Sequence, residues 1–256
     1  MKEFRDMREL SNVAGKIHSV ETCGTVDGPG IRYVVFAQGC PLRCAYCHNP
    51  DTWDANGKSS LTKSVGELMT DILKYKSYFK FSGGGVTLTG GEPLMQKDFA
   101  EALLCTCRQE GLHTTLDTSG YCDIDAQTKE ILSHTNLVLL DIKSINADTF
   151  KEVTGFTINK TLDFAEYLSG AGITAWVRFV LVPGLTDNED DLHALAAYLT
   201  TLSNVEKVGI LPFHQMGAYK WRNLKLNYKL RDTPEPSADE TERVRDLFRS
   251  YGFIVR

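Results

Sequence analysis

The chain has 256 residues, of which 42% are hydrophobic, and it carries a formal net charge of −5. This length suits one large domain or two small ones, and the acidic balance is atypical of nucleic-acid-binding proteins, which usually carry an excess of basic residues. No apolar stretch approaches the roughly 18 residues that a membrane-spanning helix needs, so we expect neither nucleic acid nor a membrane as a partner.

The N-terminal residues alternate in charge and contain no apolar run of the kind found in secretory signal peptides. We therefore expect residues 1–14 to form a flexible extension. No Gly-, Ser- or Pro-rich linker divides the remainder, so residues 15–256 are expected to form a single domain. We expect a cytoplasmic location. In a cytoplasmic chain, clustered cysteines favour metal binding over disulfide formation.

Six apolar, β-branched segments predict strands, and segments of helical periodicity lie between them. The strands are expected at residues 31–37, 86–89, 114–118, 137–142, 174–182 and 207–211. The helices are expected at residues 64–75, 98–110, 126–133, 161–169, 188–202 and 240–251, with Asp98 and Asp239 as N-caps. Six βα units are too few for a closed eight-stranded barrel, which leaves an open partial barrel or a flat, doubly wound sheet.

Residues capable of chemistry follow five of the six predicted strands at their carboxyl ends. They are Cys40 to Cys47, Gly90-Gly91-Glu92-Pro93, Asp117-Thr118-Ser119-Gly120, Asp141-Ile142-Lys143 and Pro212-Phe213-His214. Active sites of α/β barrels and open sheets assemble at this edge. A chance scatter of polar residues would not favour one edge, so we predict one shared site.

Cys40, Cys44 and Cys47 have the spacing C-x3-C-x2-C, and no fourth Cys lies nearby. Three thiolates on a cubane iron–sulfur cluster leave one iron open to bind another molecule. The alternative is a zinc site in which His48 is the fourth ligand. Adjacent ligands at positions 47 and 48 are awkward for a single tetrahedral ion, which favours the cluster.

The polar turns after the next strands each have two interpretations. The Gly90–Glu92 turn either only reverses the chain or brings its backbone close to a ligand, such as an ammonium group. Asp117 and Asp141 either cap the segments that follow them or join the Thr118 hydroxyl and a backbone carbonyl around a hard cation.

Basic side chains at the same edge are equally open. Arg178 interrupts an apolar predicted strand, and a buried charge needs a partner, either a ligand carboxylate or one of the two Asp residues. Lys143 either neutralises these carboxylates or keeps its head group in solvent. His214 is either structural or part of the site. Cys105 and Cys107 lie two residues apart on a predicted helix and are expected to be packing residues.

The cysteine motif, with Tyr46 before its third Cys, resembles the radical S-adenosylmethionine (SAM) superfamily. The preceding segment TVDGPGIR, residues 25–32, narrows the resemblance to the activases of glycyl radical enzymes. The segments YCHNPDTWD, SGGGVTLTGGEP, LDTSGY, LLDIK, VPGLTD and LPFHQMG are similar to those of the activases of pyruvate formate-lyase. Residues 49–89 contain no Cys, whereas many related activases carry a Cys-rich insertion there. Pro93 departs from some members, which have a small residue at that position.

The resemblance implies an α/β fold, the open partial (β/α)6 TIM-like barrel of the radical SAM type. It implies that a [4Fe–4S] cluster reductively cleaves SAM to a 5′-deoxyadenosyl radical. This radical would abstract a Cα hydrogen from a glycine of pyruvate formate-lyase and so install the glycyl radical. A flavodoxin- or ferredoxin-type protein would supply the electron.

The resemblance also implies roles for individual residues. Cys40, Cys44 and Cys47 would hold the cluster. SAM contacts are expected from Tyr46, Cys47, His48, Gly91, Asp141, Ile142, Lys143 and His214. A Na⁺ or K⁺ site beside the SAM carboxylate is expected from Asp117, Thr118, Asp141 and the Leu139 backbone carbonyl. Asp27 lies in the segment associated with the incoming glycyl peptide.

Overall fold

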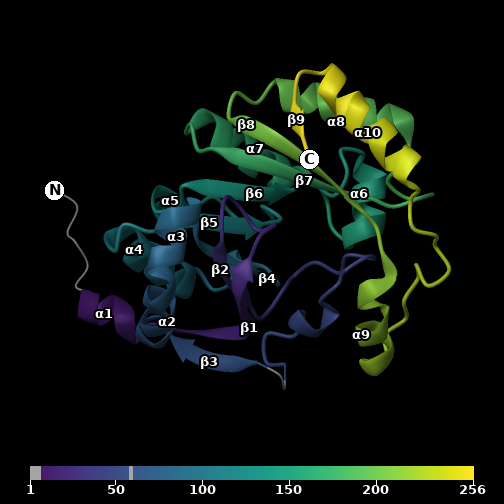
Figure 1. Ribbon diagram of the computed structural model, residues 1–256. Coiled ribbons are helices and arrows are strands. Elements are labelled where there is room, and N and C mark those ends of the chain that lie inside the picture. Colours follow the sequence, from purple (N-terminus) through teal and green to yellow (C-terminus); the bar gives the residue numbers. More distant parts are fainter. Residues whose placement is uncertain (1–6, 58–59) are drawn as a thin grey trace. The chain divides into compact units, whose positions relative to one another are not determined.

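The computed structural model describes residues 7–57 and 60–256 (Figure 1). Their contacts divide the chain into two compact units. Unit 1 comprises the chain up to Pro41, Thr52–Thr118 and Asp123–Leu139. Unit 2 comprises Leu42–Asp51, Ser119–Cys122 and Leu140–Arg256.

The sheet of unit 1 combines antiparallel and parallel pairing. Its strands are β1 (Ala14–Gly24), β2 (Arg32–Ala37), β3 (Leu61–Ser64), β4 (Gly85–Gly90) and β5 (His113–Thr118). They follow the order β3-β1-β2-β4-β5. β1 is antiparallel to both of its neighbours, whereas β2, β4 and β5 are parallel. The carboxyl ends of these three parallel strands therefore share one edge.

Strand β6 (Leu137–Asp141) neighbours β5 and β7, and its residues divide between the two units. In unit 2 the order continues β6-β7-β8-β9, with β7 (Ala175–Leu181), β8 (Val205–Pro212) and β9 (Ile254–Val255). The last three strands pair in parallel. The order ends at β3 and at β9, so the sheet is open, as an open partial barrel requires.

Helices connect these strands in both units. Unit 1 contains α1 (Met7–Asn12), α2 (Val65–Ile72), α3 (Lys76–Ser82), α4 (Lys97–Gln109) and α5 (Ala126–Ser133). Unit 2 contains α6 (Ala147–Thr154), α7 (Asn159–Gly170), α8 (Glu189–Thr200), α9 (Ala218–Asn223) and α10 (Ala238–Ser250). Within unit 2, α10 packs against α8, β8 and β9 (Figure 1).

The predicted strands and helices are present, with bounds that differ by three residues at most. Strands β1, β3 and β9 were not predicted, for physical reasons that differ. β1 carries charged and polar residues along an irregular burial pattern, β3 has four largely exposed residues, and β9 has only two residues. Helices α1, α3, α6 and α9 were also missed, and each has eight residues or fewer.

Both predicted N-caps were wrong. Helix α10 begins two residues before its predicted start, because Ser237 is its N-cap. The Ser237 side chain accepts from the Glu240 backbone N–H, and the Glu240 side chain accepts from the Ser237 backbone N–H. Helix α4 begins at Lys97, so Asp98 lies within its first turn. Gln96, before it, turns its side chain to the backbone of Lys16 at 2.8 and 2.7 Å. The Gln96 side chain therefore links the start of α4 to β1 by hydrogen bonds.

The domain boundaries stay a prediction. Residues 1–6 of the expected extension lie outside the described residues, and Leu10, in α1, is buried. In the described part of the chain, no helix has the length and apolarity needed to cross a membrane.

Candidate active site

The cysteine loop crosses from one unit to the other along the chain. Cys40 belongs to unit 1, and Cys44 and Cys47 belong to unit 2. All three are partly exposed thiols that form no disulfide. In unit 2 the Cys47 backbone N–H donates to the Cys44 carbonyl at 3.0 Å, and Ala45 donates to Val153 at 2.8 Å. These backbone hydrogen bonds therefore fix the conformation of this part of the loop.

The turn after β4 packs against the turn that leads into Cys40. The Gly91 N–H donates to the Ala37 carbonyl at 2.9 Å, and the Glu92 N–H donates to the Gly39 carbonyl at 2.8 Å. A Cβ atom at Gly91 would lie 2.1 Å from the Gly39 oxygen and 3.3 Å from Cys40 Cβ. Only glycine fits such a close backbone approach. Gly91 therefore lets the two turns of unit 1 meet at Cys40.

Buried carboxylates line the ends of β4 and β5 in unit 1. Glu92 is 1% exposed and accepts from the Thr118 hydroxyl at 2.7 Å and from the Leu94 N–H at 3.2 Å. Asp117 accepts from the Thr89 hydroxyl at 2.5 Å. The carboxylate of Glu92 was not predicted as a site group, because a Gly-Gly turn indicates a close backbone approach and gives no sign of a role for the side chain after it.

The cation site stays a prediction. The hydroxyl of Thr118, one of the expected ligands, donates its hydrogen to Glu92. A cation would therefore bind this hydroxyl through a lone pair of its oxygen. No group of three His, Cys, Asp or Glu side chains that could hold a single metal ion occurs among the described residues. The expected ligands divide between the units, with Asp117, Thr118 and Leu139 in unit 1 and Asp141 in unit 2.

Asp141 is the centre of a charged cluster in unit 2. Lys143 Nζ lies 2.8 Å from its Oδ2 atom, and Arg178 Nε lies 3.0 Å from its Oδ1 atom. Burial acts to raise the pKa of Asp141, but the charges of Arg178 and Lys143 outweigh it and hold this pKa below its usual range. For Lys143, burial acts to lower the pKa, but Asp141 outweighs it and raises this pKa. Of the two partners expected for Arg178, a ligand carboxylate or one of the two Asp residues, the structure shows Asp141.

Replacing Arg178 by Met should destabilise the fold by about 2 kcal/mol, since it leaves a largely buried carboxylate with one cation instead of two. The stability that Asp141 contributes is present above its ordinary pKa of about 4 and is lost as the pH falls through the depressed folded pKa. Urea unfolding should therefore show a larger difference between wild type and variant at pH 7 than at pH 3.

The matched control is Arg243→Met, because Arg243 pairs with Glu189 at 3.5 Å while its side chain is 52% exposed. Its expected cost is below about 0.5 kcal/mol. Equal losses in the two variants would show that the Asp141 cluster adds no more than a surface ion pair.

Tyr46 combines a buried ring with an unsatisfied hydroxyl. The residue is 5% exposed, and Lys143 Nζ lies 5.7 Å from its ring centroid. Its hydroxyl oxygen is buried and has no hydrogen-bond partner among the described residues. Burial raises the pKa of Tyr46 well above its usual range, so the phenol keeps its proton. A buried donor without an acceptor is available to a ligand.

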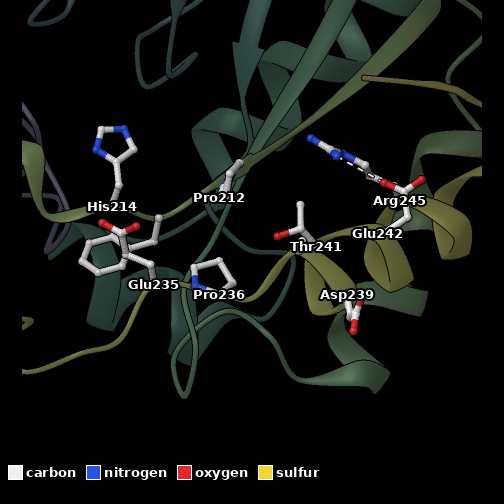
Figure 2. Close-up of a pocket in the computed structure, with 10 residues that line it drawn as sticks. Pro212, His214, Glu235, Pro236, Asp239, Thr241, Glu242 and Arg245 are labelled. Carbon is white, nitrogen blue, oxygen red and sulfur yellow. Dashed lines mark hydrogen bonds and ion pairs between the residues drawn. The ribbon is translucent and has the colours of Figure 1, made fainter.

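His48 and His214 lie against each other, with ring centroids 4.0 Å apart. Burial, helped by His214, lowers the pKa of His48, so this ring is neutral at pH 7. His214 Nδ1 is buried and has no hydrogen-bond partner in the described structure. A hollow of about 570 Å³ opens beside His214. Figure 2 shows His214 on one side of it and the Arg245–Glu242 pair on the other.

Helix α9, which the sequence did not predict, fastens the segment around Cys47. Trp221 Nε1 donates to the Cys47 carbonyl at 2.8 Å. Lys220 Nζ donates to Asn49 Oδ1 at 2.8 Å and lies 3.0 Å from Asp51 Oδ2. These partners lie 169 to 174 residues apart in the chain, so no local pattern in the sequence indicates them.

Arg32 organises the segment of Asp27 in unit 1. It is fully buried and donates to the Thr87 and Thr115 hydroxyls at 2.9 and 2.8 Å. The Thr87 hydroxyl in turn donates to the Asp27 backbone carbonyl at 2.7 Å. Burial lowers the pKa of Arg32 to about 10, which still leaves it charged at pH 7. Thus a buried cation positions the backbone of Asp27 through one intervening hydroxyl.

His113 beside this cluster should make stability depend on pH. Its Nδ1 atom lies 3.2 Å from Arg32, and burial together with that charge lowers the pKa of His113 to about 4. Between pH 6.5 and 4 the unfolded chain binds a proton that the folded chain does not, so stability falls as the pH falls.

Replacing His113 by Gln should remove about 1–2 kcal/mol of this decline between pH 7 and pH 5. Urea unfolding at both values measures the decline in wild type and variant. Equal declines would mean that His113 titrates alike in both states.

Comparisons with known proteins identify a matching family model and similar proteins. The family model described as the radical SAM superfamily matches residues 34–196. The chain is 42% identical to the pyruvate formate-lyase 1-activating enzyme of Escherichia coli (strain K12), over 95% of this chain and 99% of that protein. It is 47% identical to the pyruvate formate-lyase-activating enzyme of Staphylococcus aureus (strain USA300), over 93% and 96%.

Solved structures support the fold alone, because their sequence identities are low. Streptococcus suis SuiB bound to precursor peptide SuiA has a TM-score of 0.66 at 18% identity, covering 93% of this chain and 50% of that one. A domain of the pyruvate-formate lyase-activating enzyme from Bacteroides vulgatus has a TM-score of 0.58 at 23% identity, covering 68% and 98%.

Proposed function

The chain belongs to the radical SAM superfamily and, within it, to the pyruvate formate-lyase-activating enzymes, and from this premise we propose how its own residues serve the reaction. The enzyme installs a glycyl radical on pyruvate formate-lyase. When bound, its [4Fe–4S] cluster supplies one electron to SAM, which splits into methionine and a 5′-deoxyadenosyl radical that takes a Cα hydrogen from a glycine of the partner.

Cys40, Cys44 and Cys47 are proposed to hold the cluster. Thiolates are the usual ligands of such clusters, and these three thiols are partly exposed and form no disulfide. The backbone hydrogen bonds at Ala45 and Cys47 fix the conformation of this part of the loop. This loop, in a chain 42% identical to an activase over 95% of its length, carries the proposal.

Two of the proposed SAM contacts have a buried polar atom without a hydrogen-bond partner in the described structure. The buried Tyr46 hydroxyl and His214 Nδ1 lack partners among the described residues and can bind polar atoms of SAM. His48, neutral at pH 7, does not repel a sulfonium. Cys47, the Gly91 backbone and the segment of Asp141, Ile142 and Lys143 complete the proposed set. Lys143 provides a positive charge for a carboxylate.

Two further assignments extend this proposal. Asp117, Thr118, Asp141 and the Leu139 carbonyl would bind Na⁺ or K⁺ through oxygen ligands. Asp27, whose backbone is positioned from Arg32 through Thr87, would meet the glycyl loop of pyruvate formate-lyase. We further propose a cytoplasmic location and a flavodoxin- or ferredoxin-type protein as the electron donor.

The test is radical formation on the partner. The reconstituted enzyme, SAM and a chemical reductant are incubated anaerobically with pyruvate formate-lyase, and EPR measures the organic radical. A glycyl-radical signal is expected, and it should be lost when the radical-bearing glycine of the partner is replaced by Ala. SAM cleavage without any radical on pyruvate formate-lyase would overturn the proposal.

A further inference from the structure

A strongly basic segment of unit 2 comes a few residues after His214 in the chain. Residues 218–231, called the basic segment, contain Lys220, Arg222, Lys225, Lys229 and Arg231 and no acidic residue, although the whole chain has a net charge of −5. Acidic residues resume at Asp232. Five positive charges within fourteen residues of an acidic chain create a local field of the opposite sign.

Most of these charges face solvent without partners. Arg222, Lys225, Lys229 and Arg231 are all exposed, and their side chains form no ion pair or hydrogen bond with any described residue. On α10, by contrast, Arg243, Arg245 and Arg249 all pair with acidic side chains. The charge of the basic segment is therefore open to another molecule.

Apolar side chains accompany these charges. Met216 is 77% exposed, Tyr219 52%, Leu224 44% and Leu226 37%. Exposed apolar groups among unpaired charges are typical of surfaces that bind another protein. A site for a small anion would need no such apolar groups.

The basic segment is fastened to the cysteine loop. Trp221, stacked on Tyr228 with ring centroids 4.9 Å apart, donates to the Cys47 carbonyl. Lys220, the basic residue of the segment whose partners are described, holds Asn49 and Asp51. A protein seated on this surface is thus next to the loop to which electrons must be delivered.

We propose that the basic segment is the docking surface of an acidic electron-carrier protein, an inference that rests on the proposed function. Each SAM cleavage consumes one electron, and the carrier gives up one electron and is oxidised by one. Opposite charges steer such carriers and raise their association rates. Complexes of this kind are transient and use small interfaces, which suits a surface of a few charges and a few apolar side chains.

A structural role explains the charges less well. Basic residues stabilise the last turn of a helix through its dipole, but α9 ends at Asn223. Lys225, Lys229 and Arg231 therefore lie beyond that turn. Lys225 also has a left-handed backbone, at φ +56°, where Gly or Asn would be less strained. Local stability thus favours another residue at position 225.

The test measures binding of a bacterial flavodoxin with a net negative charge to the reconstituted full-length enzyme by surface plasmon resonance. In Lys225→Glu/Lys229→Glu, the association rate should fall about tenfold at low salt, and the difference should shrink at high salt. Lys225→Gly should also slow association without lowering the melting temperature. The control Arg243→Glu/Arg249→Glu changes the net charge equally on α10 and should bind as wild type does.

Two other outcomes separate the alternatives. The proposed docking surface would be overturned if both basic-segment variants bound flavodoxin at the wild-type rate. It would also be overturned if they weakened only the binding of pyruvate formate-lyase and not that of flavodoxin. With dithionite as reductant the double variant should form glycyl radical as wild type does. Failure of the wild type in that assay would contradict the proposed function and leave the flavodoxin binding result to be judged by itself.

Discussion

Cys44→Ser should abolish SAM cleavage, by a factor of about 10³ or more, while the chain stays folded. A serine hydroxyl is a poor ligand for iron, and two thiolates do not suffice to hold the cluster. In the loop, Cys44 contributes its carbonyl to the Cys47 N–H, and a serine keeps that bond. Formation of 5′-deoxyadenosine, iron content and the circular dichroism melting curve measure the effect.

The matched control is Cys23→Ser, since Cys23 is an exposed thiol on β1 outside the motif. It should retain the activity and iron content of wild type. Turnover retained in Cys44→Ser with a full complement of iron would refute the assignment of this thiol.

Gly91→Ala should be nearly as damaging, although it removes no ligand. Its Cβ would lie 2.1 Å from the Gly39 oxygen, so the turn after β4 or the turn into Cys40 must move. Overpacking of this kind costs about 1–3 kcal/mol. Because Cys40 follows Gly39 directly, the displaced turn would move a proposed cluster ligand with it. SAM cleavage should fall about 100-fold, since small displacements of reacting groups have effects of that size.

Gly170→Ala is the control for this substitution. Gly170 ends α7, and a Cβ atom added there would have no contact within 4 Å. Alanine at this position should leave activity unchanged and stability equal or slightly higher. If Gly91→Ala bound iron and cleaved SAM as Gly170→Ala does, the close packing of the two turns would have no functional role.

The sequence predicted the parts of the fold that repeat a strong local pattern. Strand β6 is a continuous apolar run because it is buried along most of its length, and such runs are visible without a structure. Strand β9 has two residues and is defined only by its pairing with Lys207 and Val208. Pairing partners are set by tertiary packing, which residue periodicity does not encode.

The site could be predicted to a similar extent. The cysteine spacing and the polar residues at strand ends are local signals. Arg178 is a charged residue within the apolar strand β7, so its need for a partner was also visible in the sequence. The contacts that position these groups are long-range. Arg32 meets Thr87 across 55 positions, and Trp221 meets the Cys47 carbonyl across 174. A single sequence offers no signal for such pairs beyond the presence of the residues.

The central claim, direct hydrogen transfer from the partner's glycine to the SAM-derived radical, is tested most directly by isotope transfer. Pyruvate formate-lyase produced with glycine deuterated at Cα is activated by the enzyme, and mass spectrometry measures the 5′-deoxyadenosine formed. The account predicts that the product gains one deuterium atom as the glycyl radical appears. Unlabelled 5′-deoxyadenosine, formed together with the same glycyl radical, would contradict it.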